Sequence, residues 1–170
     1  MIQIKKYSEL SEQVKSELNS HIKDEFGHIP IVNETEWAIP NWTVIYYDNA
    51  QITTFYNIVI REISVDNKKN KIGGINNVMT PKAFRRMGYA SKLLRETENL
   101  IFKDLNCEMG LLLCASTLIP FYEKFNWYEI DCPVYFEQSN RKKLWGARTM
   151  LLSKDGKVCA NKIELNGLPW

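Results

Sequence analysis

Arg85-Arg86-Met87-Gly88-Tyr89-Ala90 is the stretch that decides the fold. It follows a strand-like run, Ile72 to Thr80, and opens a helical run, Ser91 to Leu105. A strand, a tight turn and a helix in this order direct several free backbone N–H groups at one point, because the first turn of a helix has unpaired donors. The helix dipole favours negative charge at the same point. The stretch therefore predicts a binding site for an anion.

The residue types within the stretch favour a phosphate as that anion. Gly88 and Ala90 keep bulky side chains away, so a phosphate can approach the backbone. Arg85 adds a fixed cation with a forked set of donors. Two other phosphate-binding patterns do not fit, because the chain has no Gly-Lys-Ser/Thr and its Gly73-Gly74 pair precedes the end of the strand.

Composition places the chain among ordinary globular proteins. A length of 170 residues predicts one domain, residues 1–170, large enough for a real core. A net charge of +2, with both signs dispersed, argues against a nucleic-acid partner. No apolar run is long enough to cross a bilayer, and the N-terminus lacks the layout of a signal peptide, so a cytoplasmic protein without a membrane partner is expected. The four cysteines form no Cys-x-x-Cys pair and the two histidines have no partner at ligand spacing, so no metal site is expected.

Strands and helices alternate in a pattern typical of a mixed sheet. A short strand around Ile2 and Ile4 precedes a helix that Ser8 caps and Gly27 ends, and one helical turn is expected around Glu34 to Trp37. The turn signals are Asp48-Asn49 and Asn67 to Asn70. The remaining expected elements are strands over 42–47, 52–64, 72–80, 109–114, 127–130, 134–136 and 145–152, and helices over 91–105 and 117–125.

The spacing Arg-x-x-Gly-x-Ala resembles the (Gln/Arg)-x-x-Gly-x-(Gly/Ala) pyrophosphate loop of the GNAT acetyltransferase superfamily, and the order of elements is similar over nearly the whole chain. The resemblance implies an α/β (α+β mixed) fold, in which a mixed, mostly antiparallel sheet is flanked by helices on both faces and splayed at strands four and five. It also implies acetyl-CoA as cosubstrate, held by residues 85–90. Backbone groups of Val78, Met79 and Thr80 would pair with the pantetheine arm in the manner of an added strand.

A second motif, Phe121-Tyr122-Glu123-Lys124-Phe125-Asn126-Trp127, resembles the GNAT segment that carries a tyrosine on a short helix. The family usually ends this helix with Gly, and Asn126 tolerates the same backbone conformation. By this resemblance, Tyr122 would donate a proton to the departing coenzyme A thiolate, which a phenol can do. The alternative is that Tyr122 is a core aromatic residue, since it lies beside two phenylalanines.

Both ends of the chain resemble the aminoglycoside 2′-N-acetyltransferases. The segment Glu34-Thr35-Glu36-Trp37 and the terminal Trp170 match features that line the aminoglycoside pocket of that subgroup, and the match falls on Glu36 and the Trp170 carboxylate. This chain departs from the subgroup at Asn76 and Leu168, where the subgroup has acids, and Asn76 joins Glu36 and Trp170 as an expected contact of the acceptor. Such acids attract a cationic amino-sugar. The alternatives are a packed tail for Trp170 and a solvated acid for Glu36.

The sequence thus predicts an acetyl-CoA-dependent N-acetyltransferase acting on a primary amine of a small molecule, with an aminoglycoside as a candidate acceptor. Two rivals remain open. One is a GNAT-fold module that binds an acyl-CoA without turnover, because no general base is evident. The other is a peptide or protein N-acetyltransferase, because the loop from Pro30 to Pro40 carries no readable substrate code. A homodimer is also left open.

Overall fold

The computed structural model describes residues 1–139 and 141–170. Ten strands of this part form one mixed sheet in the order β6-β9-β5-β4-β3-β10-β7-β8, and β2 and then β1 continue from the other half of β3. Neighbouring strands are antiparallel, except that β4 and β5 run parallel, as do β10 and β7. The strands are β1 (Ile2–Lys6), β2 (Trp42–Asp48), β3 (Gln51–Val65), β4 (Lys68–Met79), β5 (Met109–Cys114), β6 (Tyr128–Ile130), β7 (Val134–Gln138), β8 (Arg141–Leu144), β9 (Arg148–Ser153) and β10 (Ile163–Glu164).

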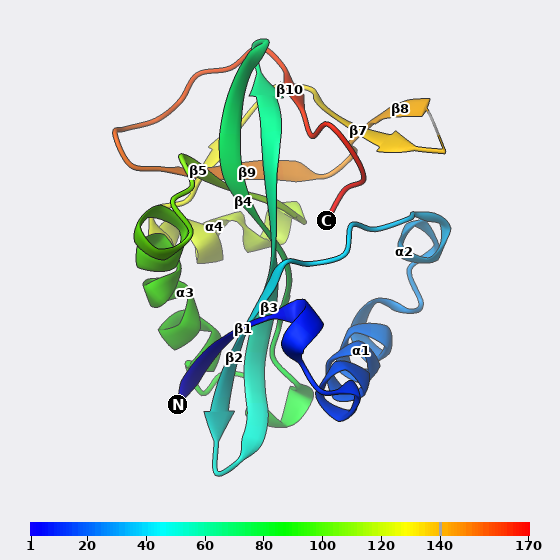
Figure 1. Cartoon of the computed structure of the whole chain (residues 1–170), viewed down its shortest axis with the longest axis vertical. Helices are drawn as coiled ribbons and strands as arrows, with labels where there is room; N and C mark the ends of the chain where they lie inside the picture. The colour runs from blue at the N-terminus through cyan, green and yellow to red at the C-terminus, as the bar shows by residue number, and fades with distance from the viewer. Residues whose placement is uncertain (140) are drawn as a thin grey trace.

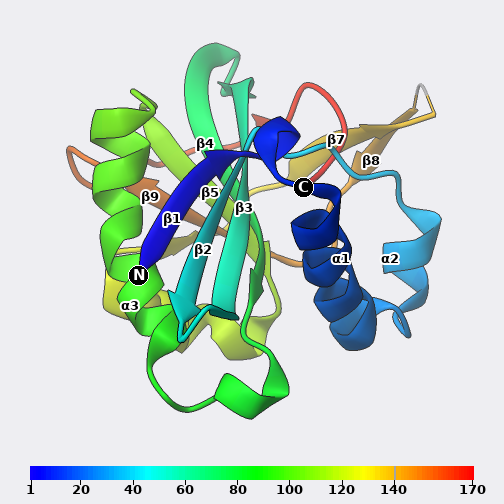
Figure 2. The same cartoon turned by 60° about the horizontal axis from the view of Figure 1, so that its bottom comes forward.

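Helices cover both faces of the sheet (Figures 1 and 2). Helix α3 (Tyr89–Asn99), extended by a π-helical turn over Leu100–Asp104, lies on one face, and α1 (Glu12–Phe26) lies on the other. The short helices are α2 (Pro30–Glu34) and α4 (Ile119–Tyr122). The expected mixed, mostly antiparallel sheet with helices on both faces is therefore confirmed.

The core is divided by the sheet into clusters of different composition. Leu93, Leu94 and Ile101 of the α3 region pack against Ile58 and Ile75 of the central strands. On the α1 side, a separate cluster contains the following buried residues: Leu10, Leu18, Ile45, Ile52, Phe55 and Met79. Burial of these apolar side chains holds α1 and α3 against opposite faces of the same strands.

Strands β4 and β5 separate toward their carboxyl ends. Their pairing runs from Ile72 opposite Met109 to Ile75 opposite Leu112, whereas β4 continues to Met79. A bulge lies in the part of β4 that pairs with β3 but not with β5, where Asn77 has a φ of 52° and the register with β3 shifts. The expected splay of the fourth and fifth strands is therefore present, and it leaves one edge of β4 without a neighbouring strand.

Two helix starts differ from the sequence prediction. Ser8 lies in a 3-10 turn, and Ser11 instead caps α1, because its side-chain oxygen accepts a hydrogen bond from the Val14 backbone N–H at 3.3 Å. The helical turn expected around Glu34 to Trp37 lies earlier, at Pro30–Glu34, because Pro30 presets the backbone of a first helical turn.

The second hairpin turn and two strands also differ from the prediction. The turn lies at Asp66 and Asn67, whose φ angles are both positive, so β4 begins at Lys68. Strands β8 and β10 were not expected. Strand β10 is only two residues long and exists because it bridges β3 and β7, a tertiary arrangement that leaves no local pattern.

No helix in the described part of the chain is long and apolar enough to cross a membrane.

Candidate functional site

A cavity of about 680 Å³ lies where the end of β4, the start of α3, the end of α1 and helix α4 meet. It brings together residues that are more than forty positions apart in the sequence. It contains nine of the residues that the sequence singled out and six that it did not. The lining residues are Glu25, Phe26, Val78, Met79, Thr80, Phe84, Arg85, Arg86, Gly88, Tyr89, Ala90, Ser91, Leu118, Phe121 and Tyr122.

The turn before α3 has the backbone form that an anion site needs. Gly88 is the N-terminal cap of α3 with a φ of 80°, and Arg86 also adopts a positive φ, of 65°. Within the described residues, no side chain caps this helix start by a hydrogen bond. A Cβ added at Gly88 would meet no heavy atom within 4 Å, so the backbone faces open space. The N–H groups of the first turn of α3 are therefore available to a ligand.

Arg85 is held between two elements at the edge of the cavity. Its Nε donates to the Thr80 carbonyl oxygen at 3.0 Å, and its Nη2 donates to Oε2 of Glu25 at 2.6 Å. The Arg85 side chain is 40% exposed, so it remains accessible. Met87 differs from its neighbours, because its side chain is 56% exposed and does not line the cavity.

The last residues of β4 form another wall. Val78, Met79 and Thr80 all line the cavity, at the place where β5 no longer pairs with β4. Thr54 of β3 donates its hydroxyl to the Met79 carbonyl at 2.8 Å, and the Thr80 hydroxyl donates to that of Thr54 at 3.0 Å. These bonds fix the strand from the β3 side and leave its β5 side open to an extended ligand.

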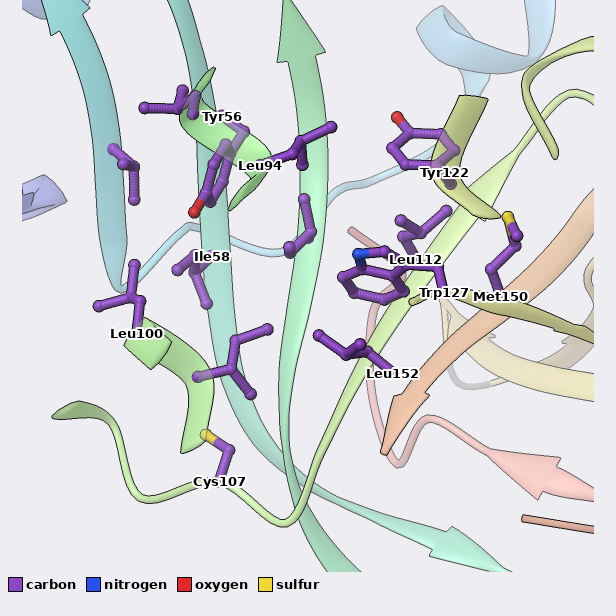
Figure 3. Packing of buried hydrophobic residues seen from close by; sticks show 14 of the residues in the cluster. Tyr56, Ile58, Leu94, Leu100, Cys107, Leu112, Tyr122, Trp127, Met150 and Leu152 are labelled. Atoms are coloured by element: carbon purple, nitrogen blue, oxygen red, sulfur yellow. The ribbon is translucent and has the colours of Figure 1, made fainter. Parts of the chain in front are cut away.

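Tyr122 lies on α4 beside the gap between β4 and β5. Figure 3 shows its ring above Trp127, with the hydroxyl pointing away from that indole. The side chain is buried, and burial raises the pKa of the phenol, with a smaller contribution from Cys114. A raised pKa keeps the phenol protonated at neutral pH, so Tyr122 can donate a hydrogen bond or a proton into the cavity. Asn126 ends this region with a φ of 64°, as expected.

The three residues expected to contact the acceptor lie outside this cavity. The Glu36 side chain is exposed and lines a separate hollow with Arg61 and Leu168. Trp170 is only 3% exposed, and its indole lies directly over Gly74, where an added Cβ would come within 2.2 Å of the ring.

Asn76, the third of these residues, lies on β4 in register with Asn57. Its Oδ1 atom is buried and has no hydrogen-bond partner among the described residues. It is a neutral acceptor two residues before Val78, near the place where β4 leaves β5. A buried acceptor without a partner is costly, so a donor supplied by a ligand would be favourable here.

Sequence reasoning missed part of the cavity wall. Glu25 and Phe26 come from the end of α1, and Phe84 comes from the 3-10 turn Lys82–Phe84. Leu118 and Phe121 flank Tyr122. Phe121 and Ser91 could have been found, because Phe121 lies inside the second motif and Ser91 directly follows the first; the others reach the cavity through tertiary packing. No group of three or more metal-ligating side chains is present in residues 1–139 and 141–170.

The family comparison matches the part of the chain that builds this cavity. A family model described as an acetyltransferase (GNAT) domain matches residues 7–130. No curated protein matches the chain.

Solved structures with a similar fold include one in complex with acetyl-CoA and one in complex with CoA. A GNAT family acetyltransferase from Brucella melitensis in complex with acetyl-CoA is 11% identical, with a TM-score of 0.59 and coverage of 96% of this chain and 94% of that chain. The Escherichia coli GNAT family N-acetyltransferase YhbS in complex with CoA is 10% identical, with a TM-score of 0.62 and coverage of 98% and 89%.

A probable N-acyltransferase of unknown function from Enterococcus faecalis V583 is 14% identical, with a TM-score of 0.56 over 75% of this chain. This chain spans about a third of the length of that protein, 32%. At identities this low, the likeness to all three structures concerns the fold alone.

Proposed function

The chain belongs to the acetyltransferase (GNAT) domain family, and from this premise we propose that it transfers the acetyl group of acetyl-CoA to a primary amine of a small molecule. The observation that carries the proposal is one cavity that joins an uncapped helix start to a buried tyrosine. Anion binding and proton donation are two of the tasks that such a reaction gives to the protein.

The described residues fit coenzyme A. The N–H groups at the start of α3 and the guanidinium of Arg85 suit a diphosphate, and the open space beyond Gly88 leaves room for it. The free edge of β4 at Val78 to Thr80 suits the amide groups of an extended pantetheine arm. The arm would then lead from Arg85 toward Tyr122.

Bound acetyl-CoA supplies a thioester, whose acetyl group passes to the amine as the C–S bond breaks. The neutral amine forms the new C–N bond and loses one proton to water or to a base. Tyr122, which stays protonated at neutral pH, gives its proton to the departing sulfur and regains one from water before the next turnover. Backbone N–H groups near Val78 stabilise the negative charge that develops on the carbonyl oxygen.

Among amines, an aminoglycoside is the more specific proposal. Glu36 supports it only through its charge, because an exposed carboxylate attracts a cationic amino-sugar, while its side chain lines a hollow separate from the cavity. Asn76 and Leu168 are uncharged where the subgroup has acids, so an amino-sugar would meet less negative charge here. The proposal therefore includes other small amines as acceptors.

A binding module without turnover is the second candidate. It is favoured by one observation: Glu25 is the carboxylate that lines the cavity in the described part of the chain, and it is engaged by Arg85 instead of being free to act as a base.

An assay of thiol release separates these functions. The protein is incubated with acetyl-CoA and a panel of aminoglycosides, polyamines and peptides with free N-termini, and free coenzyme A is measured. The proposal expects turnover with at least one small amine. Binding of acetyl-CoA without turnover on the whole panel supports the module, and preference for peptides supports a peptide acetyltransferase. Absence of acetyl-CoA binding in calorimetry contradicts all three.

A further inference from the structure

A hydrogen bond joins the start of α3 to the tip of the β2–β3 hairpin. The Tyr89 hydroxyl donates to Oδ2 of Asp48 at 2.5 Å, across 41 positions of sequence. Tyr89 is 7% exposed and lines the cavity, whereas Asp48 is exposed. Hydrogen bonds to a carboxylate are short and among the stronger ones in proteins. The bond therefore connects a surface turn to the phosphate-binding stretch.

The ring of Tyr89 is enclosed by three different elements. Phe84, from the 3-10 turn after β4, meets it edge-on at 6.2 Å between ring centroids. Tyr46 of β2 lies at 5.4 Å, and the Lys92 ammonium of α3 lies 5.3 Å from the ring centroid. These contacts restrict the ring to one orientation, in which its hydroxyl reaches Asp48.

The hairpin tip is a firm anchor. Asn49 and Ala50 form a two-residue turn, both with positive φ, and Asp48 pairs directly with Gln51. Turns of this kind match the twist of the strands that they join and hold their register. Figure 2 shows the tip of β2 and β3 beside the segment that leads into α3.

The stretch before α3 needs such an anchor. Arg86 and Gly88 both have left-handed backbone conformations, so this turn lies outside a regular hydrogen-bond ladder. At its first residue, Arg85 donates from Nε to the Thr80 carbonyl oxygen. Tyr89, the first residue of α3, donates to Asp48 just beyond the other end, so the turn is held on both sides.

We propose that Tyr89 and Asp48 are a positioning pair that presets the phosphate-binding turn of this protein. The inference rests on the proposed function. The Tyr89 hydroxyl donates its hydrogen bond to Asp48. It therefore affects coenzyme A binding by holding the turn in place, without contacting the reacting atoms. Loss of the bond therefore weakens the binding of coenzyme A, because more of the ordering of the turn must then occur on binding, and it leaves the acetyl-transfer step unchanged.

Titration calorimetry with coenzyme A tests the pair on the full chain. Tyr89→Phe keeps the ring and removes the donor, and Asp48→Ala removes the acceptor; each should raise the Kd about tenfold. Asp48→Asn keeps an acceptor oxygen and should stay within about threefold of the wild type. The double variant Tyr89→Phe/Asp48→Ala should bind no more weakly than either single variant, because both remove the same bond.

Tyr128→Phe is the matched control. Its hydroxyl bonds Ser153 and Val158 in a part of the sheet away from the cavity, so this variant should keep the wild-type Kd. With an accepted amine, Tyr89→Phe should raise KM for acetyl-CoA and leave kcat within about twofold.

The outcomes separate the pair from the proposed function. If the wild type binds coenzyme A and both Tyr89→Phe and Asp48→Ala bind it with the same Kd, the positioning pair is overturned and the proposed function stands. An additive loss in the double variant, or an equal loss in Tyr128→Phe, also overturns it. Failure of the wild type itself to bind coenzyme A contradicts the proposed function, and the inference fails with it.

Discussion

The chemistry of this protein depends on a few side chains whose surroundings change their ordinary behaviour. Burial raises the pKa of the Tyr122 phenol. The Glu25 carboxylate forms an ion pair with the Arg85 guanidinium, a group that suits a diphosphate. Each effect predicts the result of a single substitution.

Removal of the Tyr122 hydroxyl should slow the chemical step. Tyr122→Phe keeps the ring in its buried site, so the fold and the affinity for acetyl-CoA should change little. We expect kcat to fall about 100-fold, the size typical of losing a general acid. Steady-state kinetics with an accepted amine, alongside calorimetry with acetyl-CoA, measures both quantities.

The pH profile provides the control for this role. A phenol whose pKa is raised contributes as a donor at low and neutral pH and is lost only as pH rises through that raised pKa. The wild-type rate should therefore climb as the amine loses its proton and show no fall below about pH 9. A Tyr122→Phe variant with wild-type kcat would contradict the assignment.

Glu25 should act as a competitor of the diphosphate. Its Oε2 lies 2.6 Å from Nη2 of Arg85, and both side chains are about one-third exposed or more, so the pair is worth little in stability. Glu25→Gln should lower the Kd for coenzyme A about threefold, because Arg85 then need not break its ion pair with the Glu25 carboxylate before it binds the diphosphate. Lys15 forms a similar exposed pair with Glu12, so Glu12→Gln is the matched control. Weaker binding in Glu25→Gln would show that the ion pair builds the site.

At the scale of elements, the decisive feature is a turn that lets a helix start face open space. Gly88 has a φ of 80°, a conformation that other residues adopt at a cost of about 1 kcal/mol. The turn also lies beside the free edge of β4, so one corner of the sheet offers both backbone donors and an unpaired strand.

Substitution of Gly88 should damage binding more than stability. Gly88→Ala should cost about 1 kcal/mol of folding free energy and raise the Kd for coenzyme A at least about tenfold, because a methyl group would project into the space that a phosphate needs. Gly156 also has a positive φ, of 98°, with open space around it, and it does not line the cavity. Gly156→Ala should therefore show the same stability loss with unchanged binding. Equal binding losses in both variants would contradict the account.

Elements with a strong local signal could be predicted from the sequence. The run Met109 to Cys114 is apolar throughout and forms β5, and Asn126 has the left-handed backbone that its residue type favours. The start of α1 could not be placed, because Ser8 and Ser11 are equally good caps locally and packing decides between them. Strand β10 depends on pairing with two distant strands and has no local signal.

At the scale of the whole molecule, the last residues of the chain pack against the sheet. Trp170 is buried over Gly74, and the Arg61 guanidinium lies 5.5 Å from its ring, while Arg61 also donates to the carbonyls of Leu165 and Leu168. The loop residues of the candidate site could be predicted because they are contiguous in sequence. The contributions of Glu25 and the placement of Trp170 could not, because both depend on long-range packing.

Loss of the Trp170 side chain should destabilise the protein. Trp170→Ala leaves a cavity over Gly74 and should cost about 3–5 kcal/mol, which lowers the Tm by about 10 °C for a chain of this size. Leu144→Ala, at a side chain that is 60% exposed, is the surface control and should change stability by less than about 0.5 kcal/mol. Thermal unfolding followed by circular dichroism measures both. A Trp170→Ala variant with wild-type Tm but weaker substrate binding would instead support a role in the acceptor site.

The most direct test of the central claim is an NMR titration of the 15N-labelled protein with coenzyme A. The account predicts that the backbone amide signals of residues 86–91 shift together and saturate at one equivalent, because those N–H groups bind the diphosphate. Saturable shifts confined to other parts of the chain, with the amides of Gly88, Tyr89 and Ala90 unmoved, would contradict it.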